Sequence, residues 1–153
     1  MRPTLIAVLA LLLLAGCSVP IGPTPTPDVR TSAGYRRATE ARGAQVRTAI
    51  EALHAACATG GAANCAKALV TQEDVIAEPE RLIRITKAPQ GCLPLFSGYV
   101  GLMDNALDYR TTLRPALVSG SAATLIATDT AGYAKWDAGW DANARNLPSD
   151  PCK

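Results

Sequence analysis

This sequence has few aromatic residues and only a small net charge. Phe, Trp and Tyr make up 5% of the 153 residues, whereas alanine is abundant. A β-sheet sandwich generally uses more β-branched and aromatic side chains, and small side chains favour closely packed helices. The formal net charge is only +2, so the chain lacks the strongly basic character typical of proteins that bind nucleic acid. The composition favours an all-α domain and argues against nucleic acid as a partner.

Most of the short motifs that mark enzymes are missing. The sequence has no Gly-rich phosphate loop, no Gly-x-Ser-x-Gly and no Cys-x-x-Cys-His haem attachment. Its single histidine leaves few partners for acid–base or triad chemistry. We therefore expect a protein that is not an enzyme and that carries no cofactor.

The apolar run at the amino terminus is too short to cross a membrane. Leu5 to Ala15 is an unbroken apolar run of eleven residues, and a spanning helix needs about 20. Arg2 supplies a positive charge before the run, and Gly16 follows it. This order is typical of a removable export signal.

The four residues Leu14-Ala15-Gly16-Cys17 resemble the lipobox of bacterial lipoproteins. The resemblance implies cleavage before Cys17 and attachment of a diacylglyceryl group, with fatty chains such as palmitate, to its thiol. Two or three such chains hold a protein firmly on a membrane. The expected location is the cell membrane or outer membrane, with the domain outside the cytoplasm. The alternative is an ordinary secretory signal with a chance cysteine at this place.

A proline-rich segment follows the cysteine. Ser18 to Asp28 holds four prolines among Gly and Thr residues, and such a segment prefers an extended polyproline II conformation. We therefore expect three parts. Residues 1–16 form the lipoprotein signal peptide, residues 17–31 the lipidated cysteine and a Pro/Thr-rich tether, and residues 32–153 a helical domain.

Apolar residues recur at helical spacing in four segments of this domain. The spacing predicts helices over about 32–58, 64–87, 92–119 and 121–147, with the second broken or kinked at Pro79. Short connections between amphipathic helices favour an up-down-up-down topology. The predicted fold is a small antiparallel four-helix bundle.

Four cysteines lie in the helical domain: Cys57, Cys65, Cys92 and Cys152. In an exported domain they indicate two disulfides, since the gap between Cys57 and Cys65 is too long for a usual zinc pair. In the bundle, Cys57 and Cys65 lie at one end, and the other two cysteines at the opposite end. The topology therefore predicts the pairs Cys57–Cys65 and Cys92–Cys152.

Glu51-Ala52-Leu53-His54 resembles the Glu-x-x-His ligand motif of di-iron helical bundles, because residues three apart share a helix face. Such sites need a second motif and further carboxylates, and His54 is the only histidine. Both residues also flank the apolar stripe. Glu51 and His54 are therefore weak candidates for metal ligands, and a solvated pair near a helix end is the alternative.

Tyr133, Trp136 and Trp140 are spaced so that both tryptophans share one helix face. Such a row is suited to line a groove for a small apolar or aromatic ligand. At this spacing, packing in the core is the alternative.

Charged residues offer two further candidate sites. Asp104 and Asp108 lie four residues apart, a spacing that suits an acid and base pair on one helix face. Several basic residues would suit an anionic ligand or lipid headgroups: Arg81, Arg84, Lys87, Arg110 and Arg114. In both cases a solvated helix face is the favoured interpretation.

These patterns together predict a membrane-anchored lipoprotein with a non-catalytic helical domain that binds or scaffolds a cell-envelope partner. A carrier of a small ligand, lined by Tyr133, Trp136 and Trp140, is the second hypothesis. A metal-binding bundle that uses Glu51 and His54 is the third.

Overall fold

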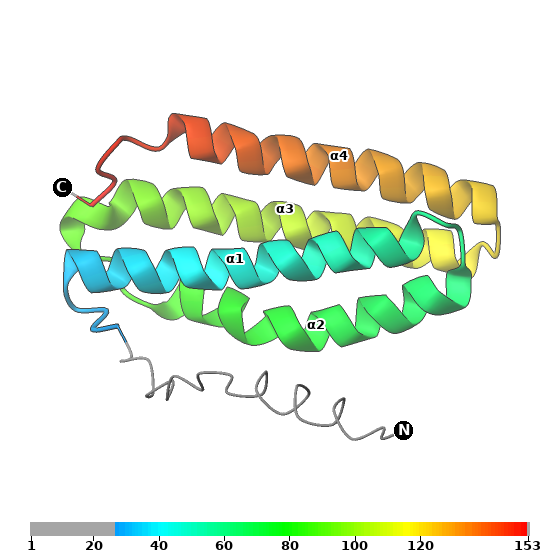
Figure 1. Ribbon diagram of the computed structural model, residues 1–153, viewed down its shortest axis with the longest axis horizontal. Helices are drawn as coiled ribbons and strands as arrows, with labels where there is room; N and C mark the ends of the chain where they lie inside the picture. Colours follow the sequence, from blue (N-terminus) through cyan, green and yellow to red (C-terminus); the bar gives the residue numbers. More distant parts are fainter. Residues whose placement is uncertain (1–26, 153) are drawn as a thin grey trace, which may run out of the picture.

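The computed structural model describes residues 27–152, which comprise the helical domain and the last residues of the tether (Figure 1). Its elements are α1 (Ser32–Cys57), α2 (Ala62–Ile85), a short 3-10 turn η1 (Gln90–Cys92), α3 (Leu93–Val118) and α4 (Ala122–Asn146). The expected all-α fold is confirmed, and each helix lies close to its predicted bounds. The signal peptide, Cys17 and most of the tether lie outside the described residues.

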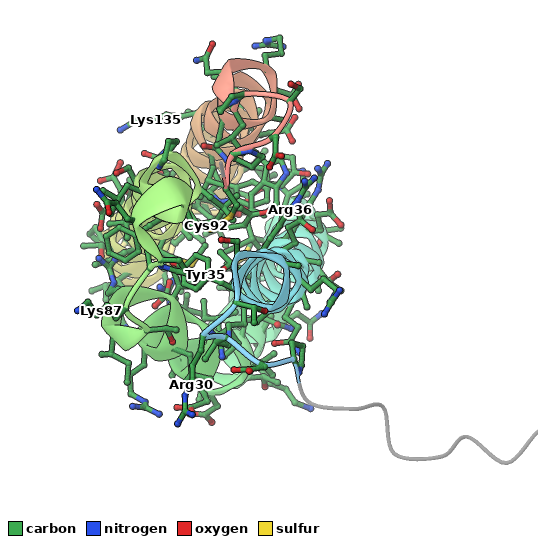
Figure 2. All side chains as sticks on the ribbon, turned by 90° about the vertical axis from the view of Figure 1, so that its left-hand side faces the viewer. Arg30, Tyr35, Arg36, Lys87, Cys92 and Lys135 are labelled. Carbon is green, nitrogen blue, oxygen red and sulfur yellow. A yellow bond between two sulfur atoms is a disulfide. The ribbon has the colours of Figure 1, made fainter. Side chains whose placement is uncertain are left out.

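The four helices lie side by side, and each runs opposite to the one before it (Figure 1). α1 packs mainly against α2, and α3 mainly against α4. The fold is therefore a four-helix bundle made of two helical hairpins. Seen end-on, α2 and α4 lie at opposite edges of the molecule, while Tyr35 and Cys92 lie between the helices (Figure 2).

Side chains and glycines at the helix ends explain where the helices begin and end. The Thr31 hydroxyl accepts a hydrogen bond from the Gly34 amide at the start of α1 (3.0 Å), and Ser121 caps α4 in the same way. Gly60 and Gly120 have positive φ angles of 71° and 67° just after α1 and α3. Glycine takes this left-handed conformation without a steric penalty, so the two glycines account for the positions of both turns.

Two prolines lie inside helices. Pro79 was expected to break or kink the second helix, and α2 is one helix that continues through it on a bent path (Figure 1). Pro115 lies in α3, which continues to Val118 before Ser119 ends it. Proline removes one backbone donor and bends the helix axis, yet both helices continue past their proline.

The hydrophobic core is supplied unequally by the helices. α1 and α3 bury ten and nine residues respectively, whereas α4 buries only Leu125, Asp129 and Trp136. The fully buried side chains include Ile50, Leu53 and Trp136. α4 is thus the least embedded helix, and its outer side borders a groove.

The structure contains the disulfides Cys57–Cys65 and Cys92–Cys152, the two pairs expected from the helix order. The first joins the adjacent ends of α1 and α2, and the second joins the start of α3 to the segment after α4. The two disulfides therefore lie at opposite poles of the bundle. None of the helices among the described residues is long and apolar enough to cross a membrane.

Candidate functional site

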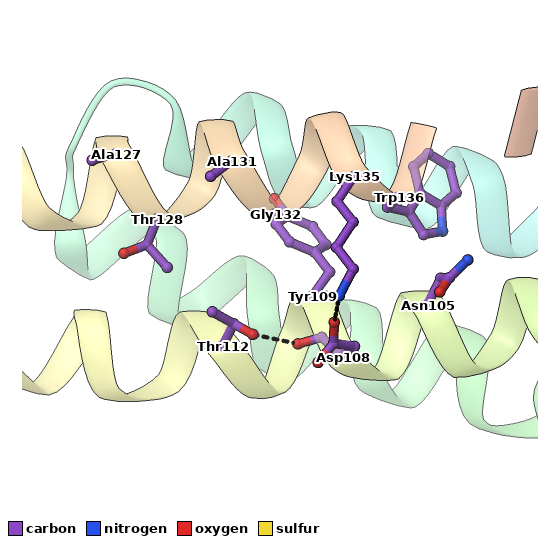
Figure 3. Close-up of a pocket in the computed structure, with 10 residues that line it drawn as sticks. All are labelled: Asn105, Asp108, Tyr109, Thr112, Ala127, Thr128, Ala131, Gly132, Lys135 and Trp136. Atoms are coloured by element: carbon purple, nitrogen blue, oxygen red, sulfur yellow. Dashed lines mark hydrogen bonds and ion pairs between the residues drawn. The ribbon is translucent and has the colours of Figure 1, made fainter. Parts of the chain in front are cut away.

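A groove of about 470 Å³ runs between α3 and α4 (Figure 3). Its size lies in the range of about 300–1,000 Å³ that is usual for small-molecule sites. Small residues of α4 such as Ala131 leave the space open, and Tyr109 and Trp136, which are only 2% and 1% exposed, lie at its floor. We refer to it as the α3–α4 groove.

Tyr109 is held firmly against α4. A Cβ atom at Gly132 would stand 2.6 Å from Tyr109 Cδ2, so the ring occupies the space that any larger residue would need. The Tyr109 hydroxyl donates a short hydrogen bond to Oδ1 of Asp129. With both its face and its hydroxyl fixed, Tyr109 forms a rigid part of the groove wall.

Asp129 is a fully buried carboxylate, 0% exposed. Besides Tyr109 it contacts His54, whose Nδ1 lies 2.7 Å from Oδ2 of Asp129. A carboxylate only accepts hydrogen bonds, so Nδ1 carries the proton in this pair. The His54 ring also stacks on Tyr133, with the ring centroids 3.9 Å apart. Residues of α1, α3 and α4 therefore meet at one buried negative charge.

Burial raises the pKa of the Tyr109 phenol far above its usual range, and the hydrogen bond to Asp129 and the charge of that residue raise it further. The neutral phenol is thus favoured by folding. Because the folded-state pKa exceeds the unfolded value of about 10, the stabilisation is complete below pH 10 and decreases as the pH rises above it.

We expect the free energy of unfolding to fall above pH 10, by about 1.4 kcal/mol per pH unit for this one phenol. Tyr109→Phe should reduce the slope by that amount. Urea unfolding followed by circular dichroism between pH 9 and 11 measures it. Tyr35, Tyr99 and Tyr133 also have raised pKa values and remain in the variant, so the slope should decrease without vanishing. An unchanged slope in Tyr109→Phe would contradict the assigned role of this phenol.

The aromatic row of α4 is one continuous set of ring contacts, with centroids 5.7 Å apart for Tyr133 and Trp136 and 5.5 Å apart for Trp136 and Trp140. Trp136 is 1% exposed and lines the α3–α4 groove. Tyr133 stacks on His54, and Trp140 packs edge-on against Tyr99 of α3. The Arg47 guanidinium of α1 lies 5.4 Å from the Trp140 ring centre. Of the three predicted ligand-binding residues, only Trp136 therefore lies at the groove, as part of both core and groove wall.

The indole nitrogen of Trp136 has no hydrogen-bond partner among the described residues, although it is buried. Figure 3 shows this nitrogen directed toward the side chain of Asn105, which lines the same end of the groove. No hydrogen bond joins the two. A buried donor without a partner costs about 1–3 kcal/mol, so a ligand that offers an acceptor here recovers that energy.

Glu51 and His54 are not directed at a common point. Glu51 accepts a hydrogen bond from Arg47 at 2.8 Å on the surface, while His54 contacts Asp129. Among residues 27–152, no group of three or more histidine, cysteine, aspartate and glutamate side chains is arranged to hold a metal ion. His54 is held between helices, whereas a solvated pair was the expected alternative to a metal site.

The two carboxylates Asp104 and Asp108 bind different cations. Asp104 pairs with Arg84 at 2.7 Å, and Asp108 with Lys135 at 2.6 Å. All four side chains are exposed, in agreement with the favoured interpretation of a solvated surface. The structure gives no sign of a shared acid–base pair here.

Arg110 corrects the expected picture of a solvated basic face. It is 5% exposed and pairs with Glu80 of α2 at 2.5 Å. Its place in α3 turns it toward α2, where burial of a charge requires a partner. Arg81, Arg84 and Arg114 do lie at the surface, in ion pairs with carboxylates.

Sequence reasoning missed Asp129, although a signal was present. Asp129 lies four residues after Leu125 and seven before Trp136, and this spacing places it on the same face of α4 as those two core residues. A charged residue on an apolar stripe indicates either a functional group or a paired buried charge. Its partners, Tyr109 and His54, are far away in sequence.

Comparison of the chain with protein-family models, with curated proteins and with solved structures gives no match.

Proposed function

We propose that this protein is a membrane-anchored lipoprotein whose helical domain, outside the cytoplasm, binds a component of the cell envelope in the α3–α4 groove. The role is binding and not catalysis. The main support for the binding site is the buried indole N–H of Trp136, which has no partner among the described residues and lies at a groove of small-molecule size. The support for the membrane location is the resemblance of Leu14 to Cys17 to a lipobox.

The fold suits such a role in two respects. The Cys92–Cys152 disulfide joins the start of α3 to the segment after α4, so the groove between α3 and α4 is held by a covalent link at the pole where α3 begins. The Asp129 network also fixes Tyr109 from behind. A wall that is rigid before binding loses less conformational entropy when a ligand arrives.

One experiment tests both halves of the proposal. The full chain is produced in a bacterium that processes lipoproteins, extracted gently with detergent, and measured by native mass spectrometry. We expect a chain that begins at Cys17 and carries a diacylglyceryl group, and an additional mass from a bound envelope component. Cys17→Ala should lose the lipid and leave the membrane fraction, since about 0.8 kcal/mol per buried CH₂ is lost.

Two matched variants assign the additional mass to the groove. Ala131→Leu fills the α3–α4 groove at an exposed helical position and should remove the bound component. Ala44→Leu makes the same change at an exposed position of α1 in a different groove, between α1 and α2, and should retain it. A wild-type chain without additional mass, or one that keeps it in Ala131→Leu, would contradict binding in this groove. A Cys17→Ala variant that stays on the membrane would contradict the anchor.

A further inference from the structure

The α3–α4 groove carries little net charge. Lys135 and Asp108 line it from opposite helices, and their side chains pair with each other at 2.6 Å (Figure 3). An anionic ligand would have to compete with Asp108 for Lys135, and a cationic ligand with Lys135 for Asp108. The pair therefore favours an uncharged occupant.

The groove contains polar groups that the protein leaves unused at one end. Trp136 Nε1–H is a donor without a partner, and the neighbouring Asn105 side chain makes no hydrogen bond to any described residue. An indole N–H only donates, whereas an amide both donates and accepts. This end of the groove thus suits a ligand with a carbonyl oxygen, which accepts from the indole N–H. An N–H next to that oxygen can donate to Oδ1 of Asn105.

The remaining wall is apolar and narrow. Tyr109 and Trp136 are 2% and 1% exposed and form the floor of the groove, and Ala131 leaves the space above them open. A flat ring suits a narrow apolar space with aromatic edges at its floor. The ring of Tyr109 is fixed by Gly132 and Asp129, which limits how far the groove can widen.

We propose that the α3–α4 groove binds an uncharged ring compound that bears a carbonyl group, an aromatic carboxamide or a close analogue, with the carbonyl oxygen on Trp136 Nε1–H. This inference rests on the proposed function and specifies the chemistry of its ligand.

Benzamide is the probe that tests it. The full chain, labelled with ¹⁵N and held in detergent micelles, gives one indole N–H resonance for each of its two tryptophans, and these are assigned with Trp140→Phe. We expect saturable benzamide binding that moves the Trp136 resonance downfield, and a smaller shift of the Trp140 resonance, since the two rings are in contact with centroids 5.5 Å apart. Toluene, which lacks the acceptor, should bind about 5- to 10-fold more weakly, the loss expected for one hydrogen bond.

Charged analogues and variants complete the test. Benzoate and benzamidine have the same ring with a negative or positive charge, and both should bind more weakly than benzamide. Trp136→Phe should reduce the affinity for benzamide about 5- to 10-fold, to that for toluene. Since this core variant risks misfolding, Ala131→Leu provides an exposed blocking change that should abolish binding, and Ala44→Leu should have no effect. Toluene also dissolves in the detergent micelles. The change in the Trp136 resonance that toluene causes in Ala131→Leu, where the groove is blocked, is therefore subtracted as background.

The contrary outcomes are distinct. Equal binding of toluene and benzamide would overturn the role of the Trp136 donor. Preference for benzoate or benzamidine would overturn the uncharged chemistry while leaving the groove as a binding site. If no probe moves the Trp136 resonance, the inference is wrong, and the additional mass in the native spectrum still decides the proposed function separately.

Discussion

Asp129→Ala is expected to lower the free energy of unfolding by about 2–4 kcal/mol, since a buried hydrogen-bonded charge is removed and its partners remain. Asp129 is 0% exposed and joins Tyr109 and His54. In the variant the Tyr109 hydroxyl stays buried without an acceptor. Urea unfolding at pH 7, followed by circular dichroism, measures the change.

A matched control separates burial from simple loss of charge. Asp104→Ala removes the same side chain from an exposed ion pair with Arg84, and exposed pairs contribute only about 0–1 kcal/mol. Asp129→Asn should lie between the two, because its amide oxygen still accepts from Tyr109. The combination of Asp129→Ala with Tyr109→Phe should be less harmful than the sum of the single changes. Equal losses in Asp129→Ala and Asp104→Ala would contradict the account of a buried network.

Removal of the Cys92–Cys152 bond by Ala substitution at both positions is expected to cost about 4 kcal/mol, and removal of Cys57–Cys65 about 2.5 kcal/mol. The sequence separations are 60 and 8 residues, and a longer loop restricts the unfolded chain more strongly. For a domain of this size, the larger loss corresponds to a fall in Tm of roughly 15 °C. Differential scanning calorimetry of the two double variants measures it.

The order of the two effects is the informative result. Each double variant serves as the control for the other, since both replace buried or half-buried cysteines at a pole of the bundle. A larger loss from the short loop would contradict a mechanism based on the unfolded chain and would indicate that local packing around Cys57 dominates.

Local signals were sufficient to predict most of the fold. Apolar spacing located the four helices, and the turns at Gly60 and Gly120 follow from glycine's tolerance of positive φ. The antiparallel order of the helices then brought Cys57 to Cys65 and Cys92 to Cys152. These features depend on residues close in sequence or on chain topology alone.

The site depended on contacts between distant residues, so the sequence predicted less of it. The partner of His54 lies 75 residues away, on another helix, and Arg110 finds Glu80 30 residues away. The three aromatic rings of α4 do contact one another in a row. The sequence could not predict that Trp140 also contacts Tyr99 of α3 and Arg47 of α1, because those partners lie on other helices.

The groove itself comes from missing side-chain volume. Gly132 admits the Tyr109 ring, and Ala131 leaves space above it. Small residues in a helix are compatible with close packing, and only the register of α3 against α4 determines whether a space remains. Composition and periodicity do not specify that register, although they do specify the helices that border it.

The most direct test of the central claim is to add an extract of the envelope's small molecules and lipids to the ¹⁵N-labelled full chain and to follow its two indole N–H resonances. Binding in the α3–α4 groove predicts that the Trp136 resonance moves saturably, that Ala131→Leu prevents the shift, and that the Trp140 resonance moves less than that of Trp136. A shift of the Trp140 resonance with Trp136 unchanged would contradict the account and would place the binding surface where Trp140 meets Arg47 and Tyr99.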